Sequence, residues 1–212
     1  MRRLAAAASL LLLWLSLLFS LLYISGTSAP LMRRMMLRFA PPASTGLEAG
    51  DYAGLADTIT AYLAGSADGM QHMLPDGSAM FTQRELAHMA DCRALFRLDA
   101  VCLMVSLAAG ILLLPCWRGL TPLDCRKLIR LMCIGLLTAL GGIGLWAAAD
   151  FNSLFLLFHR LSFNNELWLM RSTDWLIRLM PISFFMAYAA GIALLALLPP
   201  VLMLLLSRKG KP

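Results

Sequence analysis

Hydrophobic positions gather in four long runs along this 212-residue chain. Each run approaches or exceeds the roughly 20 residues that an α-helix needs to cross the apolar core of a bilayer. Polar residues are concentrated between the runs, so the pattern predicts four transmembrane helices. The predicted spans cover about residues 4–24, 100–117, 131–149 and 182–206.

The first run has some features of a signal peptide, because Arg2 and Arg3 precede it and small residues follow it. Its apolar part is about 20 residues long, whereas a signal peptide has an apolar region of roughly 7–15 residues. Pro30 also lies directly after the best cleavage position. We therefore interpret this run as a span that remains in the protein.

Two segments outside the spans, residues 26–96 and 150–181, carry most of the remaining polar residues. In the first segment, Asp51 is a candidate N-cap and Gly65 suits the end of a helix. Apolar residues between them follow a helical spacing that produces one apolar face. The sequence therefore predicts a small helical cap. The apolar positions are Tyr52, Leu55, Ile59 and Tyr62.

The stretch FTQRELAHMADC, at residues 81–92, begins the second long helix. Thr82 and Glu85 have the spacing of a capping box, which predicts a helix start near Gln83. No strong breaker follows before Pro115, so we expect one continuous helix of about 30 residues, roughly 45–50 Å long. This exceeds the apolar thickness of about 30 Å, so the first turns should project from the membrane.

Composition supports the membrane assignment, because 60% of residues are hydrophobic and 14% are charged. Soluble domains average about 25% charged residues. Nine basic residues and one acid lie at the N-terminus, in the loop at residues 118–130 and at the C-terminus, whereas six bases face eight acids in residues 26–99. Lys and Arg concentrate in cytoplasmic loops, so both termini should be cytoplasmic. The net charge of +6 is then a topology signal and does not indicate nucleic-acid binding.

Familiar catalytic motifs do not occur in this sequence. It contains no GxSxG, HExxH, P-loop or glycine-rich dinucleotide turn. Its five cysteines show no CxxC spacing, so we expect neither a disulfide framework nor a zinc site. No Ser or Cys is evidently placed as a nucleophile, although Cys92 comes closest. We expect no metal and no cofactor.

Two of the three histidines, His88 and His159, belong to different helices but to the same predicted outer membrane boundary. Histidine titrates near neutral pH and moves protons in either direction. The positive end of the helix dipole disfavours a charged ring near the helix start, so His88 should be neutral and able to act as a base. His72 lies in a loop and is expected to be a surface residue.

Several polar residues near the two histidines have both a structural and a catalytic interpretation. Glu85 is either the partner in the capping box or part of the site. Asp91 either orients His88 or pairs with an arginine of its own helix (Arg84, Arg93 or Arg97). Asn164 and Asn165 either donate hydrogen bonds to an oxyanion or cap a turn.

Two residues of the second outer segment add to this set. Trp168 suits the aromatic belt at a membrane interface. Asp174 either N-caps a helix over residues 175–180 or belongs to the site.

Two stretches, FTQRELAHMADCRALF and FHRLSFNNELWLMRSTDWLIRLMPISFF, together resemble the signatures of the Lit family. These are the lipoprotein intramolecular transacylases of Gram-positive bacteria, and the resemblance covers nearly the whole chain. The chain departs from the family pattern at Ser162, where an aromatic residue is common, and at Cys92, where a small aliphatic residue is usual. The first signature matches at Phe81, Glu85, His88, Met89, Asp91, Leu95 and Phe96. The second matches at Phe158, His159, Phe163, Asn164, Trp168, Asp174, Leu176, Ile177, Pro181, Phe184 and Phe185.

The resemblance implies an O-to-N acyl shift on a lipoprotein whose N-terminal cysteine bears an S-linked diacylglyceryl group. The sn-2 acyl chain would move to the α-amino group of the same cysteine and give a lyso-form lipoprotein. The substrate would supply the nucleophile, which fits the lack of a placed Ser or Cys. The implied partners are diacylglyceryl-modified bacterial lipoproteins and membrane lipids. The implied catalytic pair is His88 as base with His159 as acid or electrostatic partner, supported by Glu85, Asp91, Arg93, Asn164, Asn165, Trp168 and Asp174.

Two other functions stay open at this point. One is a lipid-ester hydrolase of the membrane, based on histidine or on a metal held by a Glu-His-Asp-His cluster. The other is a non-catalytic accessory protein whose histidines are structural. In every case we expect an all-α protein of the cell membrane, with four transmembrane helices, a small helical extracytoplasmic cap and a site on the extracytoplasmic face.

Overall fold

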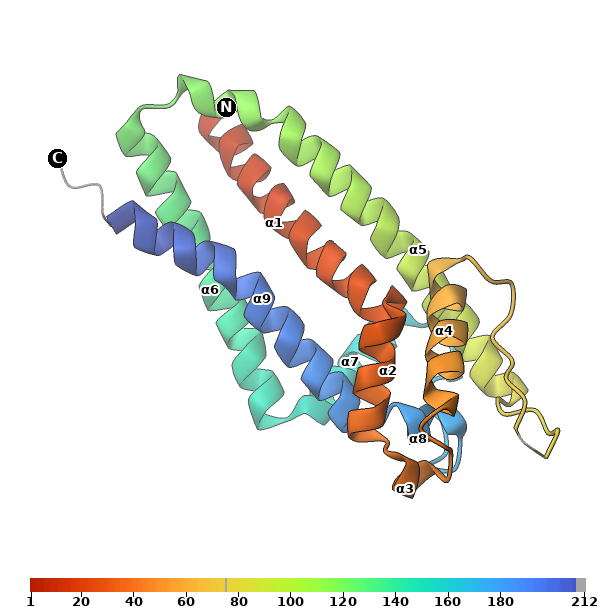
Figure 1. The fold of residues 1–212 in the computed structure, drawn as a ribbon. Coiled ribbons are helices and arrows are strands. Elements are labelled where there is room, and N and C mark those ends of the chain that lie inside the picture. The colour runs from red at the N-terminus through yellow and green to blue at the C-terminus, as the bar shows by residue number, and fades with distance from the viewer. Residues whose placement is uncertain (75, 209–212) are drawn as a thin grey trace. The chain divides into compact units, whose positions relative to one another are not determined.

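A computed structural model describes residues 1–74 and 76–208 of the chain. Apart from an isolated bridge between Met73 and Ala79, these residues form helices, turns and loops (Figure 1). The helices are α1 (Arg2–Thr27), α2 (Ala29–Phe39), α3 (Pro42–Thr45), α4 (Asp51–Ala64), α5 (Gln83–Leu112), the 3-10 helix η1 (Leu114–Gly119), α6 (Pro122–Ala149), α7 (Phe151–Ser162), α8 (Trp175–Leu179) and α9 (Ile182–Arg208).

Four of these helices are long and apolar enough to cross a membrane, namely α1, α5 with η1, α6 and α9. This confirms the predicted class, an all-α membrane protein with four transmembrane helices. The bounds predicted for the spans within these helices stay predictions. Lys209 and Lys211, which contribute to the basic C-terminus, lie outside the described residues.

The chain divides into two compact units, and the first comprises Met1–Leu21, Ala100–Phe151 and Ala190–Pro212. In this unit Ser9 of α1 donates a hydrogen bond from Oγ to the carbonyl of Gly110 in α5, at 3.0 Å. A Cβ atom on Gly110 would lie 2.9 Å from Cγ of Leu13. The lack of a side chain at Gly110 therefore lets α1 and α5 approach closely.

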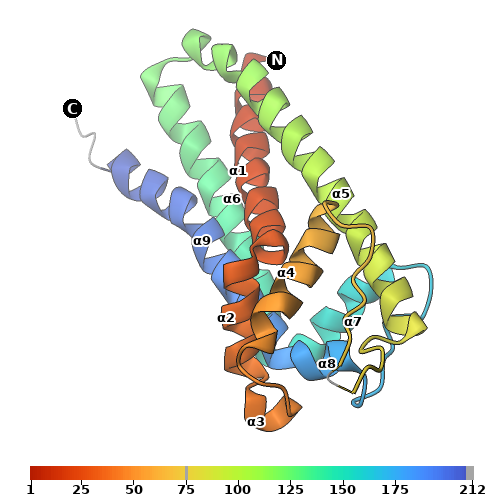
Figure 2. The same ribbon diagram turned by 45° about the vertical axis from the view of Figure 1, so that its right-hand side comes forward.

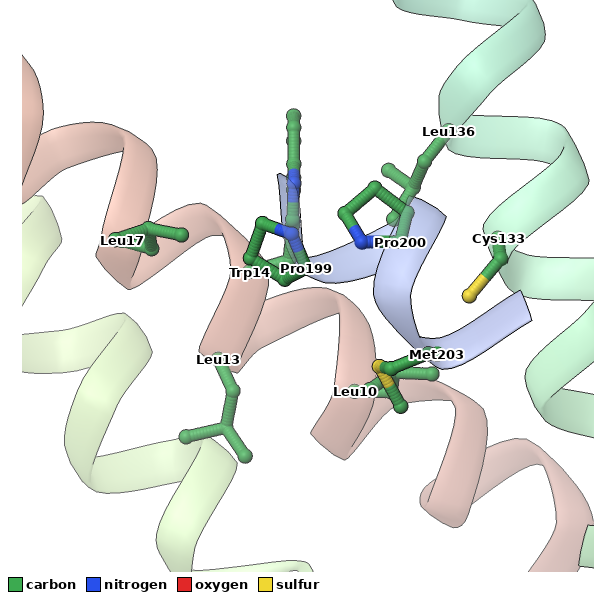
Figure 3. Close-up of a pocket in the computed structure, with 9 residues that line it drawn as sticks. All are labelled: Leu10, Leu13, Trp14, Leu17, Cys133, Leu136, Pro199, Pro200 and Met203. Carbon is green, nitrogen blue, oxygen red and sulfur yellow. The ribbon is translucent and has the colours of Figure 1, made fainter. Parts of the chain in front are cut away.

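Helix α9 contains Pro199 and Pro200 in its interior. Proline has no backbone N–H, so Pro200 leaves the carbonyl of Ala196, one turn earlier, without its helical donor. Trp14 of α1 donates to that carbonyl from Nε1 at 2.9 Å. An apolar cavity of about 150 Å³ lies beside this contact (Figure 3). Its lining residues are Leu10, Leu13, Trp14, Leu17, Cys133, Leu136, Pro199, Pro200 and Met203.

The second unit comprises Leu22–Asp99 and Asn152–Ala189, and it holds every candidate site residue. Its core includes the apolar face predicted for α4, with Tyr52, Leu55 and Ile59 fully buried. Helix α2 lies beside α4 and contributes Met32 and Met36 to the same core (Figure 2). The predicted helical cap is thus present as packed structure.

The C-terminal end of α4 matches the prediction, and the N-terminal end differs from it. Gly65 ends the helix with a φ of +81°, a left-handed conformation that favours glycine. At the start, Gly50 occupies the N-cap position instead of Asp51. The Asp51 carboxylate accepts a hydrogen bond from the backbone N–H of Glu48 at 2.8 Å. Asp51 therefore stabilises the turn before the helix.

Candidate active site

The site begins at the N-terminus of α5, where the predicted capping box is formed. The backbone N–H of Thr82 donates to Oε2 of Glu85 at 2.7 Å, and the N–H of Glu85 donates to Oγ1 of Thr82 at 3.3 Å. The helix begins at Gln83, as predicted. This start places His88 in the second turn, close to the positive end of the helix dipole.

Glu85 also has a second role that the sequence did not predict. Its side chain is completely buried, and its other oxygen, Oε1, accepts a hydrogen bond from the N–H of Leu176 at 2.8 Å. Leu176 is the second residue of α8, so Glu85 caps a helix 91 residues away as well as its own. Both carboxylate oxygens are therefore occupied by structural hydrogen bonds.

Asp174 occupies the N-cap position of α8, as one interpretation predicted. However, its side chain makes no capping hydrogen bond to that helix. Instead, Oδ2 of Asp174 accepts from the N–H of Arg171 at 2.8 Å. The first turn of α8 thus takes its anionic partner from Glu85.

His88 on α5 and His159 on α7 lie side by side. Their ring centroids are 6.2 Å apart, with an angle of 24° between the ring planes. Exposed fractions are 9% for His88 and 8% for His159, which classes both among the buried polar residues. The structure therefore brings the two predicted catalytic histidines into one buried pair.

Aromatic rings surround His159. Burial among them lowers the pKa of His159 below its ordinary value of 6.5, because a charged ring loses its hydration there. The ring is therefore neutral at pH 7. The centroids nearest to that of His159 belong to Phe155 at 4.2 Å, Trp168 at 5.1 Å, Phe158 at 5.3 Å and Phe163 at 5.6 Å.

The two nitrogens of His159 differ in their surroundings. Nδ1 lies 2.8 Å from the carbonyl oxygen of Phe155, one turn earlier on α7. A carbonyl only accepts, so Nδ1 carries the proton and donates it. In the neutral ring Nε2 then carries the lone pair, which is the state of a base.

The nitrogens of His88 also differ. Nε2 lies 3.5 Å from Sγ of Cys92, one turn later on α5. Nδ1 is buried and has no hydrogen-bond partner among the described residues. Phe163 presents its ring at a steep angle, with centroids 5.0 Å apart. Each histidine therefore has one nitrogen held from its own helix, and among the described residues no hydrogen bond is formed by the other nitrogen of His88.

A second polar contact links α5 to the loop after α7. Nδ2 of Asn165 donates to Oδ2 of Asp91 at 2.9 Å. Oδ1 of Asn165 accepts from the N–H of Leu167, and its carbonyl accepts from Nε1 of Trp168 at 2.8 Å. Arg84 of α5 donates to the carbonyl of Glu166 in the same loop. Asp91 and Arg84 thus hold the loop that carries Trp168 to the ring of His159.

The remaining candidates, Arg93 and Asn164, make no described contact with either ring of the histidine pair. Arg93 stacks its guanidinium over the ring of Tyr62 in α4, 4.8 Å from the centroid. Asn164 is exposed, and the backbone of His72 accepts a hydrogen bond from the N–H of Met80 in the loop before α5. Of the predicted residues, the ring of His159 lies beside the rings of both His88 and Trp168. Asp91 and Asn165 form a hydrogen bond that holds the loop carrying Trp168.

A metal-binding cluster is not assembled in the part of the chain that the structure describes. No group of three or more His, Cys, Asp or Glu side chains there could hold a metal ion. Glu85 is committed to backbone N–H groups, and Asp91 is committed to Asn165.

Two contacts at the histidines were not predicted from the sequence. They are the carbonyl of Phe155 at His159 and the thiol of Cys92 at His88. Both partners lie four residues from their histidine, about one helical turn away. That spacing was the available signal, but it does not by itself say which ring nitrogen is contacted.

The sequence and the fold have counterparts among known proteins. Residues 7–185 match the family described as lipoprotein intramolecular transacylase Lit. The fold resembles the membrane-integral lipoprotein intramolecular transacylase Lit from Bacillus cereus, with a TM-score of 0.74 and 20% identity over 98% of this chain and 94% of that chain. A variant of the same Bacillus cereus protein, with one histidine replaced by alanine, gives a TM-score of 0.73 and 19% identity over 98% and 92% of the two chains.

No curated protein sequence matches the chain. The family match nevertheless covers most of its length and includes both stretches that carry the histidine pair. The chain therefore belongs to the Lit family of lipoprotein intramolecular transacylases, which are membrane acyltransferases.

Proposed function

We propose that this chain moves the sn-2 acyl chain of an S-diacylglyceryl cysteine to the α-amino group of the same cysteine, which yields a lyso-form lipoprotein. The observation that carries the proposal is the buried pair of His88 and His159, in which Nδ1 of His159 is held by a carbonyl and Nδ1 of His88 has no partner among the described residues. An acyl shift from oxygen to nitrogen moves protons at two atoms, the attacking amine and the leaving glycerol oxygen. Two imidazoles side by side supply one group for each.

The proton transfers balance in the following scheme. The α-ammonium of the substrate gives one proton to Nε2 of His159, and the free amine attacks the ester carbonyl. His88 takes the second amine proton as the general base, while the His159 imidazolium returns its proton to the leaving glycerol oxygen. The products are an amide, a hydroxyl group and protonated His88, which loses its proton to solvent.

The geometry of the pair supports an exchange in which one ring gains a proton as the other loses it. Two charged rings with centroids 6.2 Å apart would repel each other in a buried site. The carbonyl of Phe155, which accepts from Nδ1, favours the charged form of His159 while that ring holds its proton. The aromatic rings around His159 keep bulk water from the acyl group.

The chain needs no nucleophile of its own in this reaction, because the substrate amine and the ester belong to one molecule. Positioning alone lowers the barrier of such an intramolecular step substantially. We assign this positioning to the loop after α7, which Asp91 and Arg84 hold through Asn165 and Glu166. We assign Glu85, whose carboxylate caps two helices, to holding His88 in place.

The proposed substrate is a diacylglyceryl-modified lipoprotein held in the outer leaflet by its acyl chains. The proposed orientation has both termini in the cytoplasm and the histidine pair on the extracytoplasmic face. The distribution of basic residues, nine to one acid on the terminal side, supports it. Membrane lipids would then surround the four apolar helices.

The proposal is tested by mass spectrometry of the N-terminal peptide of one lipoprotein. The peptide comes from cells that make only diacylated lipoproteins, with and without this chain. We expect an unchanged total acyl mass, with one chain moved from the glycerol to the amine. His88→Ala and His159→Ala should each reduce this conversion at least 100-fold, the scale on which acid–base groups contribute.

His72→Ala is the matched control, because His72 lies in the same unit outside the histidine pair. It should leave conversion unchanged. Loss of one acyl chain without N-acylation would assign the chain as a lipid-ester hydrolase instead. Full conversion by either folded histidine variant would contradict the proposed scheme.

A further inference from the structure

The thiol of Cys92 lies beside the proposed base, and the acyl shift does not use it. Its Sγ is 3.5 Å from Nε2 of His88, within the range of a hydrogen bond to sulfur. Cys92 follows His88 by four residues on α5, so both side chains lie on the same helix face. The thiol is only partly exposed, and it is a free cysteine.

The other nitrogen of His88 has the opposite surroundings. Nδ1 is buried and finds no hydrogen-bond partner in residues 1–74 and 76–208, on a side chain that is 9% exposed. A buried polar atom without a partner costs free energy, and a catalytic role is one recognised reason for a native structure to keep one. The ring of His159 lies alongside.

We propose that Cys92 is a positioning residue that fixes the orientation and tautomer of His88, so that Nδ1 is the nitrogen that takes the substrate proton. This inference rests on the proposed acyl transfer and assigns an atom within it. The Nε2–H of the neutral ring donates to Sγ of Cys92, which leaves the lone pair on Nδ1. The reacting nitrogens of the pair are then Nδ1 of His88 and Nε2 of His159.

The alternative hydrogen bond, from the thiol to Nε2, would put the ring proton on Nδ1. Nδ1 lacks a partner among the described residues in either tautomer, but with the proton on Nδ1 it could not remove a proton from the amine. A Cys–His contact is also how a nucleophilic cysteine is activated. The role of nucleophile is less suited to Cys92, because its partly buried surroundings favour the neutral thiol over the thiolate.

The test compares Cys92→Ala with Cys102→Ala, which removes another partly exposed cysteine of α5, from the other unit. Purified protein in lipid bilayers converts a synthetic diacylglyceryl lipopeptide, and kcat and KM are measured separately. We expect Cys92→Ala to lower kcat about three- to tenfold with KM unchanged, the scale of one hydrogen bond. Cys102→Ala should match the unsubstituted protein in both constants.

A spectroscopic measurement reports the tautomer directly. Nitrogen-15 NMR of the labelled protein should show His88 protonated at Nε2 and unprotonated at Nδ1. The Cys92→Ala variant should show a mixture of the two tautomers at equal thermal stability. A ring protonated at Nδ1 in the unsubstituted protein would overturn the proposal.

Two further outcomes would also overturn it. Equal kcat in the Cys92→Ala and Cys102→Ala variants would mean that Cys92 does not act through His88. A loss above about 100-fold, together with an acyl group on the Cys92 peptide, would make Cys92 a nucleophile. In each case N-acyl product from the unsubstituted protein shows that the proposed function itself stands.

Discussion

At the scale of single residues, His159 shows how burial and one backbone carbonyl set the state of a ring. Phe155 accepts the Nδ1 proton, and the surrounding aromatic rings remove water. Burial therefore lowers the pKa of His159 below 6.5, although the carbonyl opposes the shift. The ring stays neutral at pH values where an exposed histidine would already be charged.

The lowered pKa of His159 predicts a specific dependence of activity on pH. The neutral ring is the form that accepts the substrate proton, so protonation of His159 should lower kcat, and because its pKa is lowered this acidic limb should lie below pH 6.5. Trp168→Ala should open the ring to water and move this limb upward towards 6.5. A pH–rate profile of both proteins checks the prediction, and identical acidic limbs would contradict it.

The lowered pKa of His159 also makes the stability of the folded protein depend on pH. The unfolded chain binds a proton at His159 at a higher pH than the folded protein does. Stability contributed by burying the neutral ring is therefore present above pH 6.5 and is lost as the pH falls through the window below it. This change accompanies the loss of activity without causing it.

At the scale of helices, capping groups connect elements that are distant in sequence. Glu85 caps α5 through Thr82 and caps α8 through Leu176. Trp14 provides a similar contact in the other unit, because it donates to the carbonyl that Pro200 leaves free in α9. In both cases a side chain completes the backbone hydrogen bonding of a neighbouring helix.

The double capping by Glu85 predicts a large effect of its removal on stability. Glu85→Ala leaves the part-buried N–H of Thr82 and the buried N–H of Leu176 without acceptors, which should cost about 3 kcal/mol of unfolding free energy. The matched control is Glu48→Ala, since Glu48 is exposed in the same unit. Thermal unfolding in detergent measures the difference. A melting temperature equal to that of the control would refute the capping role.

At the scale of the whole molecule, the distribution of basic residues supports the proposed orientation across the membrane. Cys116 and Cys125 lie near the basic loop between α5 and α6, which is proposed to be cytoplasmic. The loop between α4 and α5 is proposed to face outward. Exposed positions for a reporter cysteine exist in both places, at Gly69 and at Leu123.

The orientation predicts opposite labelling of these two positions. A membrane-impermeant thiol reagent applied to intact cells should label Gly69→Cys, whereas Leu123→Cys should react only after the membrane is opened. The unsubstituted protein gives the background from its five cysteines. Labelling of Leu123→Cys alone in intact cells would reverse the proposed orientation.

The sequence by itself determined the features that depend on local pattern. Four apolar runs determined the spanning helices, the Thr82–Glu85 spacing determined where α5 begins, and Gly65 determined where α4 ends. It also identified both histidines as candidates. These features follow from helix periodicity, capping chemistry and hydrophobicity, which act over a few residues or over one helix.

Only the tertiary structure decided how distant residues meet. It stacked His88 on His159, directed Glu85 to Leu176 and paired Asp91 with Asn165. It also showed which ring nitrogen each histidine directs at a neighbour on its own helix, where the sequence offers several neighbours at suitable spacings. Such contacts depend on how separate helices pack, so the sequence could name the candidates for the site but could not choose their partners.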